Sequence, residues 1–154
     1  MNFAEIANRK LADVERPPIP PQGMYRFQVT KIPSMESIAN GAYDKVTFTC
    51  QAVEAYENVD EDDLKKFGGT KNVTVTRGFM FDNNDETKFA QTLFQLKSFI
   101  EKHMQVDGAE KMSITEALNA CVHAQLDGEL RWRADKNDKE VNYAEIGKTA
   151  PVRQ

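Results

Sequence analysis

The segment ELRWRADKNDKEVNYAEI, residues 129–146, combines cationic and aromatic side chains at the spacing of a β-strand. Arg131 and Arg133 are two residues apart, so both side chains lie on the same face of a strand. Guanidinium groups bind phosphate and stack on aromatic rings. Trp132 and Tyr143 are rings on which unpaired bases can stack. The segment therefore has the chemistry needed to bind a single-stranded polyanion.

The pairing of this segment with itself decides which side chains share a face. A symmetric loop centred near Asn137 and Asp138 predicts that Trp132 pairs with Tyr143, and that the two arginines lie on the other face. Two interpretations stay open, since both rings belong either to the core or to a base-binding surface. The loop itself adds two lysines, Lys136 and Lys139.

A second group of candidates lies on earlier segments that alternate like strands. Arg26 lies on the first of these strands, and Arg77 and Phe79 lie on the third, where they would form a cationic track with a ring. In the alternative interpretation Phe79 belongs to the core and Arg77 is a charge at a strand edge. The full set of predicted nucleic-acid-binding residues is Arg26, Tyr43, Lys45, Arg77, Phe79, Arg131, Trp132, Arg133, Lys136, Lys139 and Tyr143.

The residues that could support catalysis or bind metal are too scattered to predict either. His103 and His123 have no nucleophile at a recognised spacing, and the chain has no phosphate-binding glycine loop. Cys50, Cys121 and His123 could be combined into a metal site, but they lack paired ligand spacing. We therefore expect no enzyme, no cofactor, no metal and no catalytic residue, with both cysteines as buried thiols.

Charge is unevenly distributed along a chain of 154 residues with a net charge of −4. Residues 46–63 carry six acids and no Lys or Arg, whereas residues 131–154 carry six basic residues against four acids. Because the local field attracts phosphate more than net charge does, the composition does not exclude a nucleic-acid-binding protein. No apolar run approaches transmembrane length, and the N-terminus lacks the pattern of a signal peptide. We therefore expect a cytosolic protein that does not bind to or span a membrane.

The order of the predicted elements is three strands, a helical segment and two strands. Alternation predicts strands within 23–32, 45–56, 70–81, 121–133 and 140–146, and a helical stripe follows within 81–104. The fold predicted from this order is mainly β, a five-stranded OB-fold barrel with a helix between strands three and four and a short N-terminal helix within 3–12. A two-layer α+β sheet is the alternative. The predicted domains are an N-terminal helix and Pro-rich arm (1–21), an OB-fold domain (22–151) and a short tail (152–154).

The chain also resembles a known family, the phage-encoded single-stranded-DNA-binding proteins with an OB-fold core. The likeness covers about residues 17–151 and lies in PPIPPQGMYRFQV, KVTFTCQAVEAY, KFAQTLFQLKSFI and VHAQLDGELRWRADKNDKEVNYAEIGKTAPV. It implies a protein that binds and protects single-stranded DNA during phage replication or recombination in the host cytoplasm. The partners expected for such a protein are single-stranded DNA and phage or host replication and recombination proteins. A homo-oligomer is also open, because the sequence does not determine the oligomeric state. The chain ends GKTAPVRQ, without the acidic tail of many such proteins, which puts recruitment through a tail in doubt.

A second function class remains open beside DNA binding. The N-terminal helix and Pro-rich arm, residues 1–21, would also suit a non-catalytic phage assembly or protein-interaction module. The two interpretations differ in an observable way. The first requires oligonucleotide binding through Arg131 and Arg133, and the second requires self-association through residues 1–21.

Overall fold

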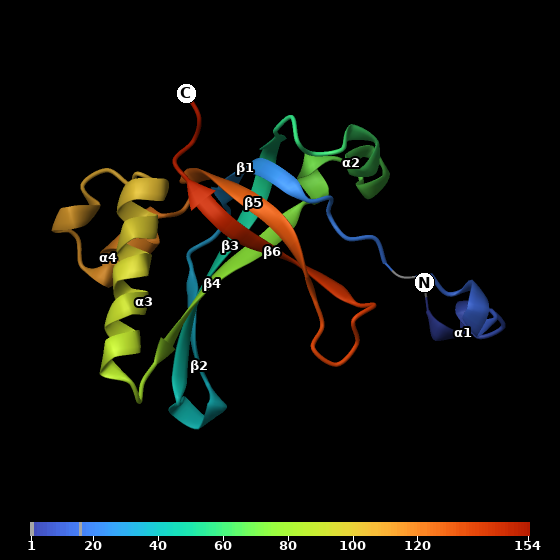
Figure 1. Cartoon of the computed structure of the whole chain (residues 1–154), viewed down its shortest axis with the longest axis horizontal. Coiled ribbons are helices and arrows are strands. Elements are labelled where there is room, and N and C mark those ends of the chain that lie inside the picture. The colour runs from blue at the N-terminus through green and yellow to red at the C-terminus, as the bar shows by residue number, and fades with distance from the viewer. Residues whose placement is uncertain (1, 16) are drawn as a thin grey trace.

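The structure is a computed structural model that describes residues 2–15 and 17–154. It contains six strands and four α-helices (Figure 1). The strands are β1 (Gly23–Val29), β2 (Ser34–Ile38), β3 (Tyr43–Ala55), β4 (Thr74–Asp82), β5 (Gln125–Ala134) and β6 (Asn142–Ala150). The helices are α1 (Phe3–Ile6), α2 (Glu61–Phe67), α3 (Glu86–Ser98) and α4 (Ile114–Ala120), and a π-helical turn, Phe99–His103, extends α3.

All six strands belong to one antiparallel sheet organised around β3. The order of the strands is β2-β3-β1-β5-β6, and β4 pairs with the other edge of β3. The first half of β3 pairs with β2, from Ser34↔Thr47 to Ile38↔Tyr43, and its second half pairs with β1. Because β3 is 13 residues long, it pairs with two short strands on one edge and with β4 on the other.

The prediction of a mainly β, five-stranded OB-fold barrel is wrong. The sheet has six strands and stays open, and with ~32% helix and 35% strand the chain is mixed α/β. Within the described residues β4 pairs only with β3 and β6 only with β5, so no strand pairing joins the two outer edges. Helical chain lies beside the β6 edge instead, where His103 Nδ1 is 2.6 Å from Thr149 Oγ1. The two-layer alternative is closer to the observed arrangement, because helices cover one face of the sheet.

Two elements, β2 and α2, lie outside the predicted strands and helices. Every residue of SMES in β2 is exposed, so the segment has no buried face to produce alternation. The second element, α2, lies at the end of the acidic part of the chain. The helix begins at Asp60, whose side chain accepts a hydrogen bond from the backbone N–H of Asp63, and ends at Gly68 in the left-handed conformation (φ 107°).

The helical layer packs through aromatic contacts against the sheet. The Phe99 ring lies 5.0 Å from Phe48 and 5.2 Å from Phe79, and Phe89 lies 5.0 Å from Phe81. Helix α3 is capped at its N-terminus, since the Asp85 side chain accepts a hydrogen bond from the backbone N–H of Lys88. These contacts fix α3 and the π-helical turn over β3 and β4.

The N-terminal helix is shorter than the predicted range 3–12. The Asn2 and Glu5 side chains form a capping box, α1 ends at Ile6, and a 3₁₀ turn follows at Leu11–Asp13. Figure 1 shows this segment set apart from the body, at the end opposite α3 and α4. Residues 1 and 16 of the predicted N-terminal region lie outside the described residues.

A buried carboxylate joins four distant segments beneath β1 and β5. Asp127 is 2% exposed and accepts hydrogen bonds from the Tyr56 hydroxyl (2.6 Å) and from the backbone N–H of Arg153 (3.0 Å). The Arg153 guanidinium stacks over the Tyr56 ring at 3.8 Å. On the neighbouring strand β1, Arg26 is the residue directly opposite Asp127 in the strand register. A hydrogen bond with Tyr56 raises the pKa of Arg26, and the charges of Tyr56, Glu54 and Asp127 add smaller contributions.

Candidate nucleic-acid interface

The β5–β6 hairpin differs from the prediction by one residue of register. Arg133 pairs with Tyr143 and Trp132 pairs with Ala144, so the predicted pairing of Trp132 with Tyr143 is wrong. The loop closes with a hydrogen bond from the Asp135 N–H to the Val141 carbonyl at 2.8 Å. A shift of one residue exchanges the two faces of a strand, so Tyr143 lies on the same face as the arginines.

Arg131 and Arg133 share one carboxylate on this face. Arg131 Nε is 3.0 Å from Glu145 Oε1, and Arg133 Nε is 3.2 Å from Glu145 Oε2. The two arginine side chains keep 55% and 59% of their surface exposed. Because one negative charge serves two positive charges, the group keeps an excess of positive charge with accessible N–H donors. We refer to Arg131, Arg133, Tyr143 and Glu145 as the arginine face.

Tyr143 is held on the arginine face by a hydrogen bond. Its hydroxyl donates to Asp135 Oδ2 at 2.8 Å, and the side chain is 48% exposed. The other oxygen of Asp135 accepts from the backbone N–H groups of Asn137 and Asp138 at the start of the loop. Those hydrogen bonds, with Tyr143 and the nearby Arg133, lower the pKa of Asp135. Asp135 therefore orders the loop and fixes the phenol ring beside Arg133.

Arg77 is a third cation at the edge of the arginine face. Its guanidinium lies 4.3 Å from the centre of the Phe79 ring and donates to the Gly78 carbonyl. Burial lowers the pKa of Arg77, the nearby charge of Arg131 lowers it further, and Glu145 opposes both. Among the residues that the structure describes, Arg77 forms no ion pair, and its buried Nε has no hydrogen-bond partner. It is a half-buried cation without a matching carboxylate.

Trp132 belongs to the other face of β5, where it holds the Pro-rich arm. Its Nε1–H donates to the Pro20 carbonyl at 2.7 Å, and its backbone N–H donates to the Gln22 side chain at 3.0 Å. The ring is 42% exposed, so it is neither the fully buried core residue nor the free stacking platform that the sequence suggested. Its contacts give it a structural role in anchoring residues 17–22.

The remaining predicted residues are not brought to the arginine face. Phe79 is 3% exposed and packs in the core, as the alternative interpretation had it. Lys45 and Tyr43 lie on the opposite face of the sheet from Arg77, where Lys45 crosses Gly78 so closely that a Cβ there would be 2.8 Å from its Cε. Arg26 is neutralised by an ion pair with Glu54 at 3.5 Å. At Gly78 the strands β3 and β4 pair without a register shift.

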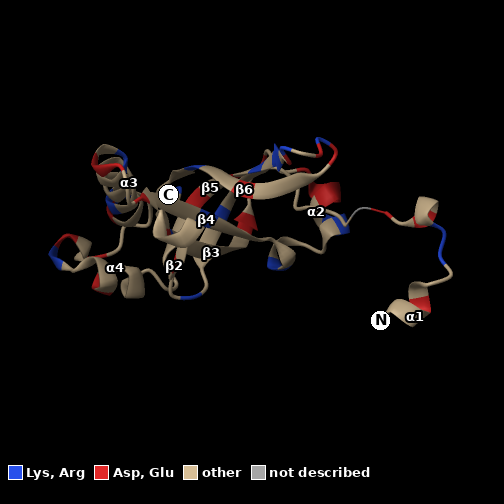
Figure 2. Cartoon of the chain, turned by 90° about the horizontal axis from the view of Figure 1, so that it is seen from below, with Lys and Arg blue, Asp and Glu red and all other residues tan. Residues whose placement is uncertain are grey.

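The hairpin loop carries the two predicted lysines beyond the arginine face. Lys136 and Lys139 are exposed, and Figure 2 shows both signs of charge at this tip of the molecule. Sequence analysis assigned no role to Glu145 or Asp135, although both lie within the segment that it singled out. The role of Glu145 could have been predicted, because shifting the predicted pairing by one residue of the second strand places the Glu145 carboxylate directly opposite Arg131.

Comparisons of the sequence with known proteins identify no family for this chain. No family model matches this sequence, and no curated protein matches it significantly. The likeness to phage single-stranded-DNA-binding proteins is therefore carried by the quoted segments alone. The arrangement of the arginine face is the basis for the functional argument that follows.

Two further observations concern membrane-spanning helices and groups of metal-ligating side chains in the described residues. None of the helices in residues 2–15 and 17–154 combines the length and the apolar character needed to cross a membrane. Over the same residues, no three His, Cys, Asp or Glu side chains are grouped so that they could hold a metal ion. Cys50 and Cys121 are both fully buried in the core.

We expect both thiols to resist modification in the folded protein. Burial raises the pKa of Cys50 to about 12 and that of Cys121 to about 11, so neither forms an appreciable amount of thiolate near neutral pH. Ellman's reagent at pH 8 should release almost no product from the native chain and two equivalents after denaturation. Rapid reaction of either thiol without denaturant would contradict the packing described here.

Proposed function

We propose that this chain binds single-stranded DNA with little sequence preference through the arginine face. The observation that supports it best is the unequal charge around Glu145. Arg131 and Arg133 share that single carboxylate, and Arg77 lies beside them without an ion pair in the described structure. Three guanidinium groups thus lie near two carboxylates, Glu145 and Asp135, which leaves an excess of positive charge, and phosphate oxygens are the natural additional acceptors.

Tyr143 favours an unpaired strand over a duplex as the ligand. Its half-exposed ring lies next to Arg133, so a base can stack on the phenol while the adjoining phosphate meets the guanidinium. Stacking contributes about 1–3 kcal/mol per base and is open to every base, because each has a π-face. A duplex keeps its bases stacked inside, so it can use only the cations. The preference for single strands therefore depends on Tyr143.

The biological setting in this proposal comes from the sequence resemblance. It is the coating of single-stranded DNA during phage replication or recombination in the host cytoplasm, by a chain without catalytic activity. Replication or recombination proteins would then meet the chain on DNA. The arginine face by itself supports only the binding step.

A titration of a labelled single-stranded oligonucleotide at several salt concentrations tests the proposal. If Arg77, Arg131, Arg133, Lys136 and Lys139 each meet a phosphate, log K should fall against log salt with a slope of about −3.5, since each contact with a single strand contributes about −0.7. Duplex DNA and single-stranded RNA of the same length serve as competitors, with duplex expected to compete poorly. A salt-independent affinity, or equal binding of duplex, would overturn the proposal.

Removing the shared carboxylate should strengthen binding. In Glu145→Gln the two guanidinium groups lose their competing acceptor, so we expect affinity for the oligonucleotide to rise about 3- to 10-fold at low salt. The matched control is Glu54→Gln, which frees Arg26 on another part of the sheet and should leave affinity unchanged. Weaker binding by Glu145→Gln would mean that the carboxylate is needed to position the arginines.

A further inference from the structure

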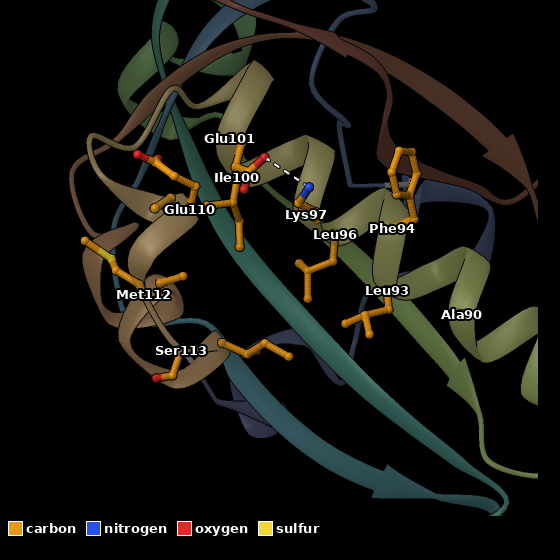
Figure 3. A pocket seen from close by; sticks show the side chains of 13 residues that line it. Ala90, Leu93, Phe94, Leu96, Lys97, Ile100, Glu101, Glu110, Met112 and Ser113 are labelled. Carbon is orange, nitrogen blue, oxygen red and sulfur yellow. Dashed lines mark ion pairs between the residues drawn. The ribbon is translucent and has the colours of Figure 1, made fainter.

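A groove lined mainly by apolar side chains lies between α3 and α4, away from the arginine face. It has a volume of about 450 Å³, and its lining includes Leu93, Phe94, Ile100, Met112 and Ile114. Figure 3 shows Leu93, Leu96 and Ile100 pointing from α3 and the following turn into the space beside Met112 and Ser113. Phe94 is 63% exposed and Ile114 is 55% exposed, so the groove leaves a large amount of apolar surface in water.

The N-terminal segment, residues 2–15, has the complementary surface. Phe3 is 79% exposed, Leu11 90% and Val14 59%. Among the described residues, every backbone hydrogen bond that residues 2–15 make stays within the segment. In a continuous helix the positions Phe3, Ile6, Leu11 and Val14 fall along one side, which is the pattern by which an amphipathic helix occupies an apolar groove.

One cation of the segment can meet a carboxylate at the rim of the groove, although residues 2–15 as a whole carry three acids against two basic residues. The rim of the groove carries the carboxylates of Glu101 and Glu110, of which Glu101 pairs with Lys97 at 3.7 Å. Lys10 falls on the apolar side of the N-terminal segment when the segment is drawn as a helix. Its aliphatic stem can cover apolar surface while its ammonium group reaches a carboxylate at the rim.

The segment cannot reach the groove of its own chain. Trp132 holds the arm at Pro20, and five residues, 15–19, then connect it to a helix ending near Val14. From Pro20 to Val14 the chain makes six Cα–Cα steps, which span at most about 22 Å when extended, whereas a folded chain of this length is about 40 Å across. Figure 1 places α1 and the α3–α4 region at opposite ends of the molecule. The occupant that carries this matching segment is a second copy of the chain.

We propose that the N-terminal segment of one copy docks as a helix in the α3–α4 groove of the next. Such a contact is heterologous, because each copy offers a segment at one end and a groove at the other, so it generates a head-to-tail row rather than a closed dimer. One short helix in one groove buries less than the roughly 1,200 Å² of a stable interface, so the association is weak and concentration-dependent. The contact is independent of DNA, and it stands or falls separately from the arginine face.

Sedimentation velocity without DNA, from low to high micromolar concentration, tests the contact directly. The unmodified chain should grow in mass with concentration beyond a dimer. Phe3→Ser with Leu11→Ser disables the segment, and Ile114→Glu disables the groove, and each should weaken self-association roughly tenfold or more, as the loss of a buried anchor does. Both sites are exposed in the single chain, so circular dichroism should be unchanged.

Mixing the two disabled variants gives the decisive result. The Ile114→Glu chain keeps an intact N-terminal segment, and the Phe3→Ser, Leu11→Ser chain keeps an intact groove. The mixture should therefore form a one-to-one complex and no larger species. The matched control is Ile32→Glu, which makes the same change at a site that is 57% exposed and should associate like the unmodified chain. A chain that stays monomeric at the highest concentration, variants that associate normally, or a mixture that forms no complex would each overturn the proposal.

Discussion

Replacing Asp127 with alanine should lower the free energy of unfolding by about 3 kcal/mol, the usual cost of breaking a buried ion-pair network. The change leaves the Tyr56 hydroxyl and the Arg153 N–H without the acceptor that each now uses. It also removes the buried carboxylate that lies opposite Arg26 on the neighbouring strand. Urea denaturation followed by Trp132 fluorescence measures the loss.

Two companion variants show whether burial is the cause. Asp127→Asn keeps the shape of the side chain and one acceptor oxygen, so it should lose clearly less stability than alanine. Glu57→Gln removes the other carboxylate that contacts Arg153, at 3.0 Å, from a side chain that is 78% exposed, and it should lose very little. Equal losses in all three would show that the network contributes through charge alone and not through satisfied buried groups.

The double change Arg131→Ala with Arg133→Ala should weaken binding of a single-stranded oligonucleotide roughly 30-fold at low salt, as expected for two lost charge-assisted contacts. The slope of log K against log salt should become shallower by about 1.4, because two phosphate contacts disappear. Fluorescence anisotropy of a labelled oligonucleotide at three salt concentrations provides both quantities. The paired Glu145 keeps part of its surface in water, so the fold should remain intact.

A control with the same loss of charge separates a local site from a general attraction. Lys88→Ala with Lys111→Ala removes two exposed lysines near α3 and α4 and changes the net charge by the same amount. It should weaken binding less than twofold at moderate salt, since these lysines lie on α3 and on the 3₁₀ turn Ala109–Lys111 rather than on the hairpin, and salt screens exposed charges that do not contact the ligand. An equal effect of the two double variants would replace the proposed site with diffuse attraction.

The elements with strong local signals could be predicted from the sequence. The strands around Phe27, Phe48 and Phe79 follow from alternation, and α3 follows from its apolar stripe and from the Asp85 cap. Whether the sheet closes into a barrel could not be predicted, because closure depends on pairing between strand edges that are far apart in the sequence. No local sequence pattern indicates that β4 and β6 do not pair with each other. The first four residues of β2 are exposed, and the strand is held by its pairing with β3, which its own residues do not indicate.

The candidate site was predicted in part for the same reason. Spacing alone placed Arg131 and Arg133 on one face, and the structure agrees. The position of Tyr143 relative to them depended on the exact closing residue of the loop, and a difference of one residue reversed it. Grouping Lys45 and Arg26 with the arginines failed because the sequence does not show that Lys45 lies on the opposite face of the sheet from Arg77. Neutralisation by Glu54 likewise depends on a contact across strands.

The register of the hairpin has a consequence for how this protein could change over time. Arg133 faces the phenol ring only because seven residues, 135–141, separate Ala134 from Asn142, the last pair of the ladder. Losing or gaining one residue there would turn Tyr143 toward the Pro-rich arm and bring its neighbour Ala144 beside the guanidinium groups. Losing or gaining two would return Tyr143 to the arginine face, opposite a different residue of β5. Loop length in related chains should therefore vary in even steps, as a parity rule on a surface that otherwise tolerates substitution.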